Sequence, residues 1–139
     1  QGTHRGTPAM YHFTALVTLL AILVYFYSSI LVSRARGKFG VKLPAIAGNP
    51  DFERVFRAQM NTLEWLPIFL PALWLFAIYV SDDVAAALGL VWVAGRILYV
   101  RGYARAVAKR RLGFYIQALA TIALFVGAFA AIVMRLMQA

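Results

Sequence analysis

Cysteine is absent from the 139 residues of this chain, and acidic side chains number only five. Without cysteine the chain has no disulfide, no thiolate metal ligand and no protein thiol nucleophile. Charged residues make up 14% of the chain, against roughly 25% in an average soluble domain. These absences exclude a disulfide-stabilised scaffold and an ordinary soluble domain, and we expect no metal site.

Long apolar runs are what the sequence has instead. Hydrophobic residues make up 63% of the chain, and the mean hydropathy is +0.74. Four segments are long enough to cross a hydrocarbon core of ~30 Å as helices: about 11–33, 57–80, 84–108 and 112–136. The pattern predicts an all-α membrane protein, a four-transmembrane-helix bundle in one domain over 10–139. Residues 1–9 are polar and precede Met10, and we interpret them as residues left by cloning.

The net charge of +9 is concentrated beside the apolar segments, which favours membrane interfaces and small anions over nucleic acid. The basic residues lie in two connections: Arg34, Arg36, Lys38 and Lys42, then Arg101, Arg105, Lys109, Arg110 and Arg111. The hairpin at 81–83 is acidic, and Asp82 or Asp83 is expected to cap the third helix. The positive-inside rule then predicts cytoplasmic basic loops, with both termini outside.

A polar face begins the second span. Arg57, Asn61 and Glu64 are spaced i, i+4 and i+7, so they share one face of a helix. A carboxylate at this depth is costly and points to a functional site. Pro67 follows three residues after Glu64. It either kinks the helix and widens the space beside this face, or it is an ordinary proline tolerated by membrane-helix packing.

The third span carries a second polar face. Arg96, Tyr99 and Tyr103 are spaced i, i+3 and i+7. The tyrosines alone are also typical of an interfacial aromatic belt, and an arginine can extend to the interface. Because a buried charge needs a partner, we expect Glu64 to be a counter-charge of Arg96.

Arg110 and Arg111 lie where the fourth span begins. At that point the dielectric falls, and an arginine becomes a strong stabiliser of anions. The rest of the run from 101 to 109 is explained as an anchor on lipid headgroups. Arginines, an amide, a carboxylate and tyrosines together suit a zwitterionic, peptide-like ligand with several carboxylates and one amine.

Two blocks of sequence resemble a known family. Residues 52–64, FERVFRAQMNTLE, and 89–105, GLVWVAGRILYVRGYAR, are similar to the signature of the MAPEG family, membrane-associated proteins in eicosanoid and glutathione metabolism. The match is closest to its branch of microsomal glutathione transferase 2 and leukotriene C4 synthase. The resemblance covers the chain after Met10. It implies a homotrimer that binds glutathione between neighbouring subunits near the cytoplasmic surface.

The resemblance also implies roles for individual residues. Glu64 matches the position that binds the amine of glutathione, and Arg110 the arginine that stabilises its thiolate. The other implied glutathione-binding positions are Arg36, Arg57, Gln59, Asn61, Arg96, Tyr99 and Tyr103. Gln59 matches a position that reaches a neighbour's glutathione, and Arg34 is an alternative to Arg36 because the following loop differs in length. Trp65 replaces the tyrosine usual in that branch, which removes one expected hydrogen bond.

The resemblance therefore implies a glutathione transferase that joins the glutathione thiolate to a lipophilic electrophile, with peroxidase activity on lipid hydroperoxides as an extension. Glutathione would be the cosubstrate, no metal would be needed, and membrane lipids would surround the protein. Because the chain is rich in arginine and alanine, as bacterial proteins often are, we expect a bacterial inner membrane. The alternative is a non-catalytic, lipid-binding scaffold, which has no need of Arg110. A channel is disfavoured because no span has a repeated polar lining.

Overall fold

The computed structural model describes residues 10–139, and our interpretation of residues 1–9 lies outside that range. The described chain is α-helical without strands: α1 His12–Phe39, α2 Pro50–Tyr79, α3 Asp82–Arg105, the short 3-10 helix η1 Val107–Arg110, and α4 Arg111–Gln138. Each long helix has the length and composition of a membrane span. The predicted fold class, an all-α bundle of four membrane helices, is confirmed.

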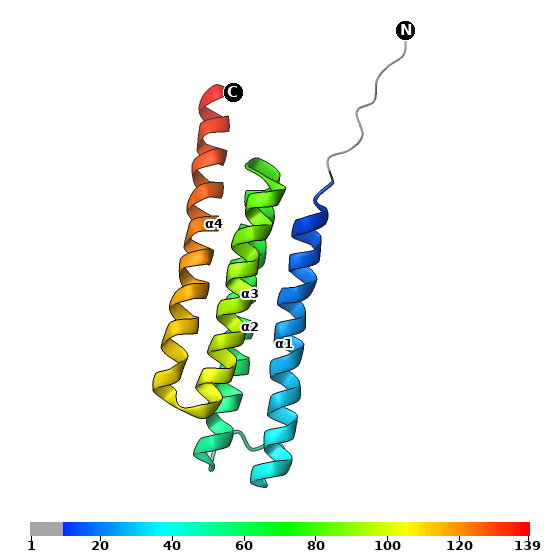
Figure 1. Ribbon diagram of the computed structural model, residues 1–139, viewed down its shortest axis with the longest axis vertical. Coiled ribbons are helices and arrows are strands. Elements are labelled where there is room, and N and C mark those ends of the chain that lie inside the picture. The colour runs from blue at the N-terminus through cyan, green and yellow to red at the C-terminus, as the bar shows by residue number, and fades with distance from the viewer. Residues whose placement is uncertain (1–9) are drawn as a thin grey trace.

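The two middle helices form the centre of the bundle. α2 packs against α3, and both α1 and α4 pack against that pair (Figure 1). The connection 40–49 and η1 lie at one end, whereas the α2–α3 hairpin, the start of α1 and the C-terminus lie at the other (Figure 1). Both basic connections therefore share one end of the molecule.

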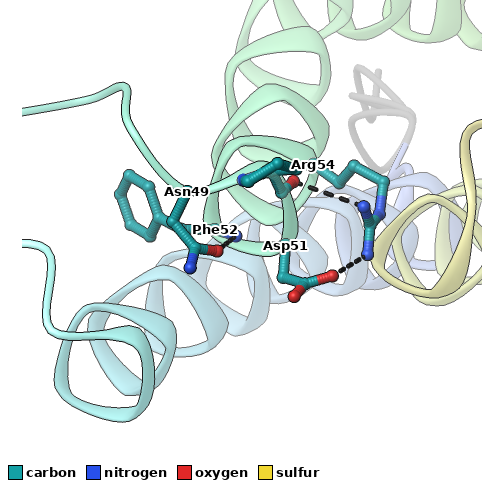
Figure 2. A network of polar contacts seen from close by, with 5 residues as sticks. Asn49, Asp51, Phe52 and Arg54 are labelled. Atoms are coloured by element: carbon teal, nitrogen blue, oxygen red, sulfur yellow. Dashed lines mark hydrogen bonds and ion pairs between the residues drawn. The ribbon is translucent and has the colours of Figure 1, made fainter.

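The first connection is shorter than the sequence indicated. α1 continues to Phe39, where Gly40 adopts a left-handed conformation (φ 67°) that ends the helix. α2 begins at Pro50, and the Asn49 side chain accepts a hydrogen bond from the Phe52 amide at 3.0 Å (Figure 2). These two caps leave only 40–49 outside the helices.

The predicted cap of α3 is wrong. Ser81 caps that helix, accepting a hydrogen bond from the Val84 amide at 3.3 Å. The Asp82 carboxylate instead accepts from the amides of Phe13 at 3.3 Å and Thr14 at 2.9 Å. Because α1 has no side-chain cap of its own, this neighbouring carboxylate satisfies its first amides and ties the hairpin to α1.

Small residues bring α3 and α4 into backbone contact. A Cβ on Gly113 would lie 2.3 Å from the Tyr99 amide nitrogen, and one on Gly95 would lie 2.8 Å from the Gln117 nitrogen. Only glycine permits this approach, which is typical of packed membrane helices. It seats Tyr99 directly against the start of α4. Between α2 and α3, Phe69 stacks on Trp92 with ring centroids 4.1 Å apart.

Candidate functional site

A polar hollow of about 270 Å³ opens where α2, α3 and the start of α4 meet. Its lining residues are Asn61, Tyr99, Arg110, Arg111, Phe114 and Tyr115. It contains two guanidinium groups, an amide and two phenol rings, and no carboxylate. This composition suits an anionic ligand, and the volume is near the lower end for a small-molecule pocket.

A buried arginine supports one wall of the hollow. The Arg96 side chain is fully buried (0% exposed). Its Nη2 donates to Asn61 Oδ1 at 2.8 Å, and its Nη1 donates to Thr62 Oγ1 at 3.3 Å. The guanidinium carbon also lies 4.4 Å from the centroid of the Tyr99 ring. Neutral acceptors and aromatic faces therefore surround this cation.

Glu64, expected as a counter-charge of Arg96, is not in direct contact with it within the described residues. Within residues 10–139, Arg54 and Asp51 form the ion pair, and Glu64 forms none. Glu64 is exposed, whereas Arg96 points between α2 and α3 toward Asn61 and Thr62. The direct partners of Arg96 on α2 are therefore an amide and a hydroxyl group, which the spacing along each helix did not reveal.

The bond from Arg96 also fixes the direction of the Asn61 amide. An arginine offers only donors, so the asparagine oxygen must face it. The Asn61 nitrogen is then the atom that can point into the hollow. An amide N–H group there can donate to a carboxylate or a carbonyl of a ligand.

Arg110 is positioned by a short helix and two tyrosines. It is the last residue of η1, and its Nη1 donates to the Val107 carbonyl at 2.6 Å. Its guanidinium lies 5.7 Å from the Tyr103 ring, which in turn meets Tyr99 edge-on at 5.6 Å. Its remaining donors are available to the hollow, beside the positive end of the α4 dipole.

Arg57 and Glu64 lie on α2, one turn to either side of Asn61. Both side chains are exposed, and neither belongs to the lining of the hollow. They flank the part of α2 that contributes Asn61, so a ligand larger than the hollow would meet them as it extends along the helix.

Arg36 and Gln59 have their contacts away from the hollow, at the first connection and at α1 respectively. Arg36 donates to the Ala45 carbonyl at 2.6 Å, and its guanidinium covers the Phe52 ring at 4.8 Å. Gln59 donates to Ser29 Oγ at 2.8 Å. Neither lines the hollow that holds Arg110.

Arg34, the alternative to Arg36, lines a different hollow. That hollow lies where the end of α1, the start of α2 and the end of α3 meet, and Ala104 is its lining residue from α3. Arg36, by contrast, donates a hydrogen bond to the α1–α2 connection at Ala45.

Sequence reasoning missed several lining residues. The family resemblance implied no ligand contact for Arg111, yet it lines the hollow with Phe114 and Tyr115. The signal was the i, i+4 spacing of Arg111 and Tyr115. Trp65, the departure from the family pattern, packs edge-on against Phe114 with ring centroids 5.7 Å apart. Trp65 is not itself part of the lining, so it supports Phe114 from behind and offers no hydroxyl group.

Comparison with known proteins places these residues in a family. The sequence profile described as the MAPEG family matches residues 14–130. The chain is 53% identical over 124 residues to an uncharacterised protein of Synechocystis sp., covering 89% of this chain and 90% of that protein. It is 45% identical over 100 residues to microsomal glutathione S-transferase 2 of Homo sapiens, covering 72% and 68% of the two chains. It is 42% identical over 104 residues to leukotriene C4 synthase of Bos taurus, covering 75% and 69%. This chain therefore belongs to the MAPEG family of membrane proteins.

Proposed function

We propose that this protein is a membrane-bound glutathione transferase that conjugates glutathione to a lipophilic electrophile. The observation that carries the proposal is the convergence of Asn61, Tyr99 and Arg110 on one anion-binding hollow. Two named relatives, microsomal glutathione S-transferase 2 and leukotriene C4 synthase, support glutathione as the cosubstrate.

The charges of the site complement those of glutathione, which carries two carboxylates, one ammonium group and a thiol. Arg57 and the Asn61 amide supply donors for a carboxylate. Glu64 forms no ion pair within residues 10–139, so its carboxylate is available for the ammonium group. Tyr99 lines the hollow, and Tyr103 contacts both Tyr99 and Arg110 beside it.

The reacting sulfur belongs to glutathione, because the chain has no cysteine. A free thiol has a pKa of roughly 8.5, so only about 3% of it is thiolate at pH 7. Arg110 favours the thiolate by its charge and never gives up its own proton. The sulfur then forms a bond to the electrophilic carbon, and the leaving group departs with the electron pair of the broken bond.

Peroxidase activity is an extension of the same chemistry. The thiolate sulfur attacks a hydroperoxide oxygen, the O–O bond breaks, glutathione sulfenic acid forms, and the departing alkoxide takes a proton from water to become the alcohol. A second glutathione then yields the disulfide and water. An apolar hydroperoxide would reach the site from the membrane, as would an apolar electrophile.

The division of the candidate residues into two groups supports a homotrimer. Arg36 on α1 contacts the first connection and Gln59 contacts Ser29 of α1, whereas Asn61 and Arg110 line the hollow beside α4. One copy does not bring these groups together, and the hollow is small for a tripeptide. A neighbouring subunit that presents its Arg36 and Gln59 would complete the pocket.

The membrane orientation follows from the charge at one end of the bundle. Both basic connections lie at the end that also holds the hollow (Figure 1). By the positive-inside rule this end faces the cytoplasm, where glutathione is available, with the termini outside. A bacterial inner membrane is the proposed location.

A single assay tests the proposed function. The purified chain in detergent is mixed with glutathione and a chlorinated nitroaromatic electrophile, and glutathione binding is measured by calorimetry. We expect glutathione-dependent conjugation and saturable binding. If the protein bound fatty acids while glutathione neither bound nor reacted, the scaffold alternative would replace the transferase.

A further inference from the structure

A groove on the outer face of α1 and α3 lies away from all the residues assigned to glutathione. Its volume is about 540 Å³. Its lining residues are Leu20, Leu23, Val24, Phe26, Tyr27, Ile30, Val93, Ile97 and Arg101. Apart from the Tyr27 hydroxyl, Arg101 is the polar member, and it stands at the end nearer the basic connections. The rest of the groove is a hydrocarbon surface on the outside of a membrane bundle.

A second hollow, of about 470 Å³, continues the groove past Arg101. It lies between the ends of α1, α2 and α3, and its lining includes Arg34, Lys38, Asp51 and Ala104. On α1 the groove ends at Ile30, and Arg34 of the second hollow lies one turn further on the same face; on α3 Ala104 lies one turn beyond Arg101. The two hollows therefore form one path, apolar first and then basic.

The basic end has unbalanced positive charge. Asp51 is the acid in the lining, and it is paired with Arg54 (Figure 2). Arg34, Lys38 and Arg101 are exposed and form no ion pair within residues 10–139. Arg34 and Lys38 thus line a hollow whose only carboxylate is already paired, and Arg101 adds a third cation at the adjoining end of the groove. This excess of positive charge calls for an anion from outside the chain.

The apolar part has the depth of one membrane leaflet. From Leu20 to Ile30 the helix rises about 15 Å, at ~1.5 Å per residue. Half of a hydrocarbon core of ~30 Å is the same length. An acyl chain that fills the groove would therefore place its headgroup at the level of Arg101 and Arg34.

We propose that this path binds one anionic phospholipid, with its phosphate among Arg34, Lys38 and Arg101 and an acyl chain in the groove. Basic pockets between membrane helices favour anionic headgroups. A second copy of the chain is a less suitable occupant, because it has few carboxylates with which to neutralise these cations. At this end of the bundle its acids are Glu53 and Asp51, and Asp51 is already paired with Arg54. The site is independent of glutathione and of the proposed reaction.

Native mass spectrometry of the purified full chain tests the site directly. Phosphatidylglycerol and phosphatidylcholine with identical acyl chains are titrated, and the retained lipid is counted for each. We expect a clear preference for phosphatidylglycerol. Substituting Arg34→Gln, Lys38→Gln and Arg101→Gln together should abolish it, at about fivefold for each cation removed.

A charge-matched control separates a site from general attraction. The triple substitution of Lys42→Gln, Lys109→Gln and Arg135→Gln removes the same charge elsewhere on the exposed surface. This control should keep the preference. If the control lost the preference equally, or if the first triple variant kept it, the proposed site would be wrong.

The groove is tested without altering any charge. Ile97 is 37% exposed, and Ile97→Trp fills the groove with a larger ring. We expect weaker retention of phosphatidylglycerol; unchanged retention would contradict the proposal. Because the chain lacks cysteine, Ile97→Cys alone reports on a second copy: a disulfide-linked pair of chains in a bilayer would show that protein, not lipid, covers the groove.

Discussion

Arg96 Nη2 donates to Asn61 Oδ1 at 2.8 Å, so a fully buried cation holds an amide that lines the polar hollow. The arginine itself does not belong to that lining. It acts as a positioning residue, because it fixes which Asn61 atom faces the ligand. Arg96 was assigned to glutathione by resemblance, and in this chain its contribution would be indirect.

This relationship predicts that Asn61→Asp separates folding from binding. The new carboxylate can still accept from Arg96, so the melting temperature should stay within a few degrees of the wild type. The ligand loses an N–H donor and meets a negative charge, so glutathione affinity should fall by about tenfold or more. Calorimetry and thermal unfolding on the same preparation measure both. Normal affinity in a folded Asn61→Asp protein would contradict the role of the amide.

Glu64→Gln is expected to weaken glutathione binding without destabilising the protein. The side chain is exposed and forms no ion pair within residues 10–139, so its charge adds little to folding. Loss of a charge-assisted contact with the ammonium group should cost about tenfold in affinity, with less effect on turnover.

A glutathione analogue without the amine provides the control for Glu64. If Glu64 binds that amine, the substitution should change the affinity for glutathione and leave the affinity for the analogue unchanged. Equal losses for both ligands would assign Glu64 to another contact. Arg57→Ala serves as the matched variant, which should weaken both ligands because it removes a carboxylate contact.

The contact between α3 and α4 predicts a structural effect of Gly113→Ala. The added Cβ would meet backbone atoms, the Tyr99 nitrogen at 2.3 Å and the Gly95 oxygen at 2.5 Å, and backbone cannot move aside cheaply. We expect a loss of about 3 kcal/mol, toward the upper end for overpacking, and weaker glutathione binding as Tyr99 shifts from Arg110. Gly37→Ala is the control: nothing lies within 4 Å of its Cβ position, and it should be neutral or stabilising.

The sequence correctly predicted those features of the fold and the site that depend on the spacing of residues along a single helix. Apolar runs gave the four spans, and the i, i+4 spacing correctly grouped Tyr99 with Tyr103. It did not predict what depends on how helices are rotated against each other. Arg96 donates to Asn61 and Thr62 of α2, and Asp82 caps α1 rather than α3, because both outcomes are decided between helices.

Arg110→Ala is expected to act on the thiol chemistry more than on binding. Without the guanidinium, the pKa of bound glutathione should rise toward its free value of roughly 8.5, leaving about 3% thiolate at pH 7. Turnover at pH 7 should fall by about tenfold to thirtyfold. The sign of the shift requires recovery above pH 8.5, where hydroxide removes the proton without help. Thiolate absorbance in the ultraviolet, followed while glutathione is titrated into the protein, reports the same change without turnover.

The control for Arg110 has to come from outside the hollow. Arg111 is unsuitable because it lines the same space, and Arg111→Ala should lower glutathione affinity while the bound thiol keeps its lowered pKa. Lys109→Ala removes one exposed charge from η1 and should leave both the absorbance and the pH profile unchanged. If Arg111→Ala abolished the thiolate signal while Arg110→Ala preserved it, Arg111 and not Arg110 would be the arginine that stabilises the thiolate. If neither changed the signal, Arg36 of a neighbouring subunit would become the candidate, and the same titration on Arg36→Ala would decide it.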